Sequence, residues 1–456
     1  MKTLLLIEAW GLISVIFFGL AYMTPMGLFT SYGIVEEITN GMIPAAYIVA
    51  LIVMSFTVYG YGQMVKAYPV AGSTYTYAQK SIHPNVGFIV GWAFLLDYAF
   101  ASIINSLVMG LYLHASIPSV PMWVWIVLFL IVVSTINYLG IKLATNINTI
   151  IFIFQVLVLV IFAGLCINGI LNGQGTGVLF SVTPFFNSES AIIPIMSGAA
   201  ILCMSFLGFD SITTLSEETK NPEKTIPKAM FLIILIGAVL FIGISYLAHS
   251  VFPDFTQFND LDVAGSEIAL FIGGNLFSAV FLSGMIIGVL GTGIASVAGM
   301  SRLLFAMGRD GVISKKIFGY VHPKYKTPTN NIIVTCIIAL SSLLIDLTTA
   351  VSLINFGAFV TYIAVNVSVI SHYYIRNNKR TFKGTILYLI IPFIGGGLNL
   401  WMLSRLGETS LVIGGLWLLS GILYLAWLTR LFTKRAPEMQ VADIQNGKLE
   451  NKNVTA

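Results

Sequence analysis

Apolar runs of about 20 residues recur along this chain, and each is long enough to cross the roughly 30 Å hydrocarbon layer of a bilayer. Apolar residues make up 57% of the 456 residues and charged residues only 9%. In lipid, backbone polar groups need internal partners, so runs of this length fold as helices. The sequence therefore predicts an all-α polytopic membrane protein.

The loops between these runs assign the two sides of the membrane. Lysines and arginines gather in alternate loops, whereas the opposite loops carry only Arg405 but hold carboxylates such as Glu36 and Glu37. By the positive-inside rule, both termini are expected in the cytoplasm. The twelve predicted spans are residues 9–36, 42–66, 86–114, 121–140, 145–170, 192–216, 227–252, 275–305, 328–346, 349–374, 385–404 and 410–432.

The predicted span 192–216 contains the stretch FLGFDS, in which Gly208 weakens the helix beside a carboxylate, Asp210. A charge inside the bilayer costs at least about 2.5–3.5 kcal/mol, so such residues face a bundle interior or water. Secondary transporters use a broken hydrophobic helix of this kind as a binding site. A Gly-kinked structural span, with Asp210 paired to a neighbour, fits this stretch equally well.

The first predicted span is interrupted as well, by Gly19, Pro25 and Gly27 within GLAYMTPMGLF. Pro25 lacks a backbone donor, so carbonyls around Gly19 to Tyr22 lose helical partners. A proline kink filled by a neighbouring helix is the alternative. However, the two interrupted spans open the two predicted five-helix halves, which points to a binding site near the bilayer midplane.

A second intramembrane carboxylate, Asp97, lies in GWAFLLDYAF within the third span. At helical spacing Ala101, Ile104 and Asn105 share its face, so this face points into the bundle. A structural pair with a Tyr or Asn is the alternative, but intramembrane acids are functional by default.

Other polar features carry weaker signals. Thr74 to Ile82 could form a short amphipathic helix at the cytoplasmic surface, and Thr292 and Ser296 could offer hydroxyls to a cation or to helix packing. The five histidines lie at span ends or in loops without metal-like spacing, so no metal site is predicted. The polar segment 434–456 is predicted to be a disordered cytoplasmic tail after a single transmembrane domain, 1–433.

Several motifs resemble those of the amino acid–polyamine–organocation transporter superfamily, and within it the chain looks most like the putrescine importers of enteric bacteria. The similarity rests on GLAYMTPM, YPVAGSTYTYAQKSIHPNVGFIVGW and SFLGFDSITTLSEET, and extends from Gly19 to about Leu431. The resemblance implies a LeuT-like 5+5 inverted repeat, over 9–170 and 192–374, with helices 1 and 6 unwound at mid-membrane. Two extra helices would follow over 385–432.

The resemblance also implies coupling to protons rather than sodium, without a cofactor or a nucleic-acid partner, in the bacterial inner (plasma) membrane. Amino acid carriers of this superfamily generally have Gly-Ser-Gly in helix 1, whose amides hold the substrate carboxylate. Here the matching residues are Pro25, Met26 and Gly27, and Gln155 stands where many proton-coupled members have a lysine. These departures favour a substrate without a carboxylate.

A diamine needs two anionic or aromatic ends with an apolar middle, and Asp97 and Asp210 supply the acids. Burial of two neighbouring carboxylates favours a proton on one of them when no diamine is bound. The expected function is import of putrescine or a similar polyamine by proton-coupled symport, with Asp210 and Asp97 carrying the proton. The predicted substrate-binding residues are Tyr22, Met23, Thr24, Asp97, Tyr98, Phe206, Gly208, Phe209, Asp210 and Ser211.

Three alternatives remain at this stage. A proton-coupled amino acid permease or an amino acid/polyamine exchanger of the same superfamily is the nearest. A channel would conduct without saturating. A membrane enzyme would need a catalytic cluster, and no HExxH, DxxD or Ser-His-acid set is evident, so an enzyme is not expected.

Overall fold

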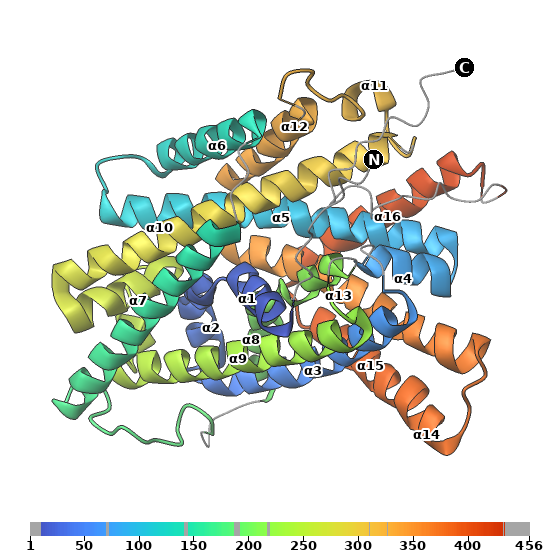
Figure 1. The fold of residues 1–456 in the computed structure, drawn as a ribbon. Coiled ribbons are helices and arrows are strands. Elements are labelled where there is room, and N and C mark those ends of the chain that lie inside the picture. Colours follow the sequence, from blue (N-terminus) through green and yellow to red (C-terminus); the bar gives the residue numbers. More distant parts are fainter. Residues whose placement is uncertain are drawn as a thin grey trace.

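The computed structural model describes residues 11–69, 73–140, 145–186, 192–216, 219–309, 311–325, 327–431 and 433. Within them every regular element is a helix (Figure 1). Eleven helices are long and apolar enough to cross a membrane, and a shorter apolar helix, Thr329–Leu343, covers the ninth predicted span. The prediction of a polytopic α-helical membrane protein is confirmed. The predicted tail, 434–456, lies outside the described residues.

The helices divide into an interior group and a peripheral group. In the spans containing α3 (Ile43–Ala67), α5 (Pro84–Ser116) and α13 (Leu347–Val369), 61%, 67% and 78% of the apolar stretch is buried inside the protein. In contrast, α6 (Met122–Leu139) and α16 (Glu408–Leu428) are 22% and 17% buried and expose large apolar side chains. Lipid solvates these outer faces, so the polar chemistry of the protein belongs to the interior helices.

The first span is broken where the sequence predicts. Helix α1 (Leu12–Met23) ends at Thr24, and the chain continues as the 3₁₀ helix η1 (Pro25–Thr30) and then α2 (Tyr32–Thr39). Thr24 has φ +47°, which is strained for a β-branched residue. Gly19, expected to help break the helix, lies inside α1 instead. Its added Cβ would stand 2.3 Å from Ile233 Cδ1, so Gly19 permits close packing on the long helix α9 (Pro222–Val251).

The sixth span is broken at its predicted position as well. Helix α8 (Ile192–Leu202) passes into η2 (Cys203–Phe206), turns at Gly208 with φ +110°, and continues as η3 (Phe209–Leu215). Asn355 of α13 donates from its Nδ2 to the carbonyls of Ala200 and Ile201, both at 2.9 Å. These carbonyls end the α-helical part, so Asn355 supplies donors that the irregular backbone lacks.

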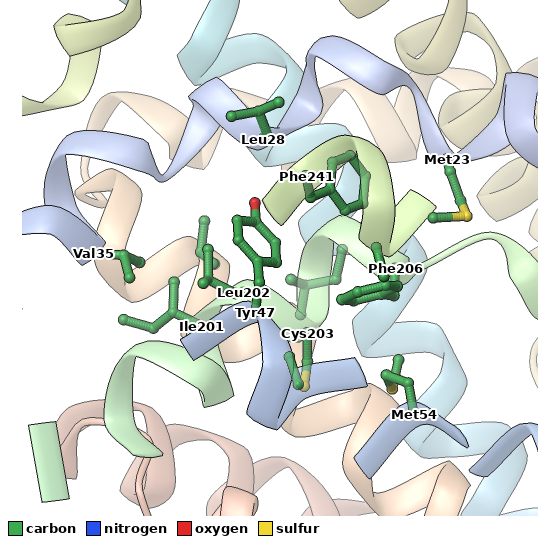
Figure 2. Packing of buried hydrophobic residues seen from close by; sticks show 14 of the residues in the cluster. Met23, Leu28, Val35, Tyr47, Met54, Ile201, Leu202, Cys203, Phe206 and Phe241 are labelled. Atoms are coloured by element: carbon green, nitrogen blue, oxygen red, sulfur yellow. The ribbon is translucent and has the colours of Figure 1, made fainter. Parts of the chain in front are cut away.

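The breaks are held within an aromatic core. Tyr47 of α3 stacks on Phe241 of α9 with ring centroids 5.4 Å apart, and Phe206 of η2 meets Phe241 edge-on at 5.5 Å. Figure 2 shows Phe206, Phe241 and Tyr47 grouped together, with Met23 on the side of Phe206. Helix α9 lies along α3 in Figure 1, and this aromatic group lies between them.

The short helix predicted near Thr74 to Ile82 is present as α4 (Ser73–Ser81), but it does not lie on the surface. Thr74 to Ala78 are buried, and α4 packs against α5, α13 and η3.

The eighth predicted span, 275–305, is the part of α10 (Ala264–Arg309) that follows a kink at Gly274, where φ is +62°. The remaining elements are α7 (Thr145–Leu171), η4 (Phe255–Gln257), η5 (Leu261–Val263), α11 (Lys315–Phe318), α12 (Thr329–Ala339), η6 (Leu340–Leu343), η7 (Ile370–Arg376), α14 (Phe382–Thr385), η8 (Ile386–Ile390) and α15 (Ile391–Leu403).

Candidate substrate-binding site

The structure brings the two predicted intramembrane carboxylates together. Asp97 lies in the middle of α5, and Asp210 is the second residue of η3, just past the break in the sixth span. The two groups lie close enough to interact electrostatically. By residue, both are half-buried, and each lies among the interior helices.

The backbone around the break lies against the Asp210 carboxylate. Its carboxylate lies within hydrogen-bonding reach of the amides of the Gly208–Ser211 turn and of the Tyr61 hydroxyl. Two features require glycine at position 208. Its φ is +110°, and an added Cβ would lie 2.7 Å from Tyr22 Cδ1. The two broken spans therefore meet at Gly208, which brings Tyr22 close to Asp210.

Two predicted tyrosines flank the carboxylates. Tyr22, near the end of α1, and Tyr98 of α5 each interact with both Asp97 and Asp210. The Tyr22 side chain is 39% exposed, which leaves much of its ring open to a bound molecule. Tyr98 packs on Gly299 of α10, whose added Cβ would stand 2.3 Å from Tyr98 Cε1. A cation between these rings would meet both π-faces and carboxylates.

Three further tyrosines near Asp210 were not predicted: Tyr61 of α3, Tyr77 of α4 and Tyr362 of α13. The Tyr61 hydroxyl is hydrogen-bonded to Thr74 Oγ1 at 2.6 Å, which ties α3 to α4 beside the site. Phe209 packs edge-on against Tyr61 with ring centroids 5.5 Å apart. No spacing in the sequence relates these positions, because they meet only when four separate elements pack.

The other predicted residues pack around the breaks in the first and sixth spans. Phe206 and Phe209 have fully buried rings in the aromatic core, and Met23 is 4% exposed and packs on Gly237 of α9. The Ser211 hydroxyl donates to the Gly208 carbonyl. Thr24 provides the strained turn that ends α1.

The hydroxyls of Thr292 and Ser296 serve helix packing. Thr292 Oγ1 donates to Asn105 Oδ1 at 2.6 Å, and Ser102 Oγ donates to Ser296 Oγ at 3.2 Å. Both bonds join α10 to α5, so this polar stripe fixes the helix that carries Asp97.

Among the described residues, neither carboxylate has a lysine or arginine partner. Within the ranges that the structure describes, the only ion pair is between Glu36 and His249. The charge of Arg302 of α10 reaches Tyr98. The site therefore concentrates negative charge and aromatic faces, which suits a small organic cation. Among the described residues, no three His, Cys, Asp or Glu side chains form a metal-binding group.

Comparison with known proteins defines the class. The amino acid permease family matches residues 14–423, so the chain belongs to this family of membrane transporters and is not an enzyme. The resemblance predicted from the motifs of the first, third and sixth spans is thus confirmed.

Individual relatives cover nearly the whole chain. The low-affinity putrescine importer PlaP of Escherichia coli (strain K12) is 45% identical over 432 residues, which cover 94% of this chain and 95% of PlaP. The methylthioribose transporter of Bacillus subtilis (strain 168) is 26% identical over 89% of this chain and 90% of its own length. The branched-chain amino acid permease BcaP of the same organism is 26% identical over 89% of each chain.

Proposed function

We propose that this permease imports putrescine or a similar polyamine by alternating access, as a proton-coupled symporter. The observation that carries the proposal is the pair of interacting carboxylates, Asp97 and Asp210, which have no basic partner among the described residues. The two ammonium groups of a diamine would each meet one of these acids. The 45% identity to the putrescine importer PlaP supports this cargo.

In the proposed site, one ammonium lies at Asp210 and the other at Asp97, with Tyr22 and Tyr98 against the substrate. A desolvated ammonium over an aromatic ring gains about 2 kcal/mol or more. The chain past the break starts with Pro25, which lacks the amide that could bind a substrate carboxylate. This loss favours a diamine over an amino acid. Met23, Thr24, Phe206, Gly208, Phe209 and Ser211 shape the site by fixing the two breaks.

Coupling would follow from the same two acids. Without a diamine, two close carboxylates in a low-dielectric interior repel each other, and a proton on one of them relieves the repulsion. For symport the proton must enter together with the diamine. One of the two acids, Asp97 or Asp210, would carry the proton while its carbonyl oxygen accepts a hydrogen bond from one ammonium, and the other acid would pair with the second ammonium. This route needs no sodium site and no cofactor.

We further propose twelve transmembrane helices arranged as a LeuT-like 5+5 inverted repeat, with the halves at 9–170 and 192–374 and two added helices over 385–432. Both termini would be cytoplasmic, in the bacterial inner membrane. Basic side chains at one set of helix ends support this orientation, including Lys66 of α3 and Arg309 of α10. The breaks in the first and sixth spans support the repeat.

Uptake of labelled putrescine into proteoliposomes, with and without an inward proton gradient, tests the function. Saturable, gradient-stimulated uptake is expected, blocked by unlabelled putrescine and not by alanine. Transport of alanine or another amino acid in place of putrescine would refute the two-acid diamine site and support the amino acid permease alternative, which the similarity to BcaP represents.

A further inference from the structure

The ion pair between Glu36 and His249 lies outside the proposed substrate site and joins two different spans. Glu36, in α2, is fully buried, and its Oε1 contacts Nδ1 of His249 in the last turn of α9. The sequence placed Glu36 in a loop, whereas the structure places it in α2. The second carboxylate oxygen of Glu36 and the nearby Tyr32 hydroxyl are buried without a hydrogen-bond partner.

The backbone after α2 is shaped to receive the imidazole. Gly41 has φ +84°, and its added Cβ would stand 2.8 Å from His249 Cε1, so no other residue fits without displacing the ring. The Gly41 amide donates to the Glu36 carbonyl at 3.0 Å, which closes the turn around the pair. His249 is thus held between the Glu36 side chain and the turn that ends α2.

No other charge is placed to substitute for His249. Helix α8, which packs against α2, carries no ionisable side chain. The lysines and arginines of the neighbouring elements, Lys66 of α3, Lys224 and Lys228 of α9, and Arg302 and Arg309 of α10, all lie at the opposite helix ends. The other ionisable side chains on the elements around the pair are Tyr22 of α1, Tyr32 and Glu37 of α2, Tyr47, Tyr59 and Tyr61 of α3, Cys166 of α7, Asp210 of η3, Glu223 and Tyr246 of α9, Asp254 before η4, Asp260 and Asp262 at η5, and Glu267 of α10.

The pair depends on one proton. With that proton, Glu36 and His249 form a neutral, hydrogen-bonded unit. Without it, a buried carboxylate faces a neutral ring, and burial of an unpaired charge is strongly unfavourable. The His249 side chain is 11% exposed, which gives the proton access from the surface.

The break at Thr24 and the 3₁₀ helix η1 separate α2 from α1. We propose that Glu36 and His249 form a second proton-binding site, which holds α2 against the outer end of α9 while it is protonated and releases α2 when the proton leaves. External protons would therefore favour the position in which α2, the outer part of the first span, lies against α9. This inference rests on the proposed transport function and adds a coupling site distinct from Asp97 and Asp210.

The test measures initial putrescine uptake into proteoliposomes at a fixed internal pH, while the external pH varies from about 5 to 9. The variants are Glu36→Gln, His249→Gln and the double variant, with His249→Asn if His249→Gln does not fold. Glu37→Gln, which alters the adjacent exposed carboxylate of α2, is the matched control. Equilibrium binding of putrescine to each purified variant reports whether it is folded.

In the wild type and in Glu37→Gln, uptake should fall as external pH rises. In both single variants this dependence should be at least about halved, and the double variant should behave like the singles because either change removes the same unit. Binding of putrescine should change by less than about threefold, since the substrate site is intact. Wild-type pH profiles in folded Glu36→Gln and His249→Gln would overturn the proposal, as would additive effects. If the wild type carries alanine rather than putrescine, the proposed function fails alone, and the same profiles measured with alanine decide the role of the pair.

Discussion

Asp210→Asn is the most informative single substitution at the proposed site. The amide is close in size to the carboxylate and keeps one oxygen that can accept from Tyr61 or from the Gly208–Ser211 turn. The negative charge and one accepting oxygen are lost. Since the described residues offer no cation to Asp210, the substrate ammonium is its expected countercharge, and the substitution leaves that ammonium buried beside a neutral group.

Removal of one partner from a buried, hydrogen-bonded charge pair costs about 2–5 kcal/mol. This corresponds to a loss of about 30- to 4,000-fold in putrescine affinity. A monoamine of similar length, 1-aminobutane, can still use Asp97 and should lose much less. The affinity gap between putrescine and 1-aminobutane, measured by equilibrium binding to the purified protein, should therefore narrow in the variant.

Asp254→Asn is the matched control, because this exposed carboxylate accepts only local hydrogen bonds, from Thr256 and Gln257 of η4. It should leave both affinities unchanged. If Asp210→Asn lowers the affinity for both ligands equally, or for neither, then the second ammonium does not lie at Asp210 and the two-acid site is wrong.

Asp97→Asn should impair uptake or make it insensitive to the proton gradient. Uptake measured with and without the gradient tests this.

Three backbone and packing predictions follow. Gly208→Ala adds about 1–3 kcal/mol of backbone strain and a clash with Tyr22, so putrescine affinity should fall at least about tenfold in the binding assay. Gly299→Ala should displace the Tyr98 ring and weaken binding, whereas Gly291→Ala on the same helix meets only an ordinary contact at 3.5 Å; equal affinities in the two variants would contradict this role of Tyr98. Asn355→Leu leaves two buried carbonyls at the end of α8 unpaired, and each unpaired carbonyl destabilises the folded state by about 1–3 kcal/mol. The thermal unfolding midpoint should therefore fall. An unchanged midpoint would show that the break does not need these donors.

The sequence identified the carboxylates and the breaks because each is locally anomalous. Asp97 and Asp210 stand out in apolar runs, and Pro25 and Gly208 interrupt a helical pattern, so no neighbour is needed to notice them. The amphipathic segment near Thr74 was predicted to lie on the surface, and the structure buries it. Its polar groups find partners on other elements, as Thr74 does on Tyr61, and a local pattern contains no such partner.

The sequence by itself determined the membrane class, the approximate spans and the family, because hydrophobic length and short motifs are local properties that lipid reads directly. Only the tertiary structure decided which tyrosines surround Asp210 and that Glu36 pairs with His249. Residues 36 and 249 are 213 positions apart, and such contacts depend on how helices pack rather than on the composition of either helix. The tertiary structure also separated Phe206 and Phe209, buried in the aromatic core, from Tyr22 and Tyr98, which flank the carboxylates, although all four are aromatic residues near a break or an acid.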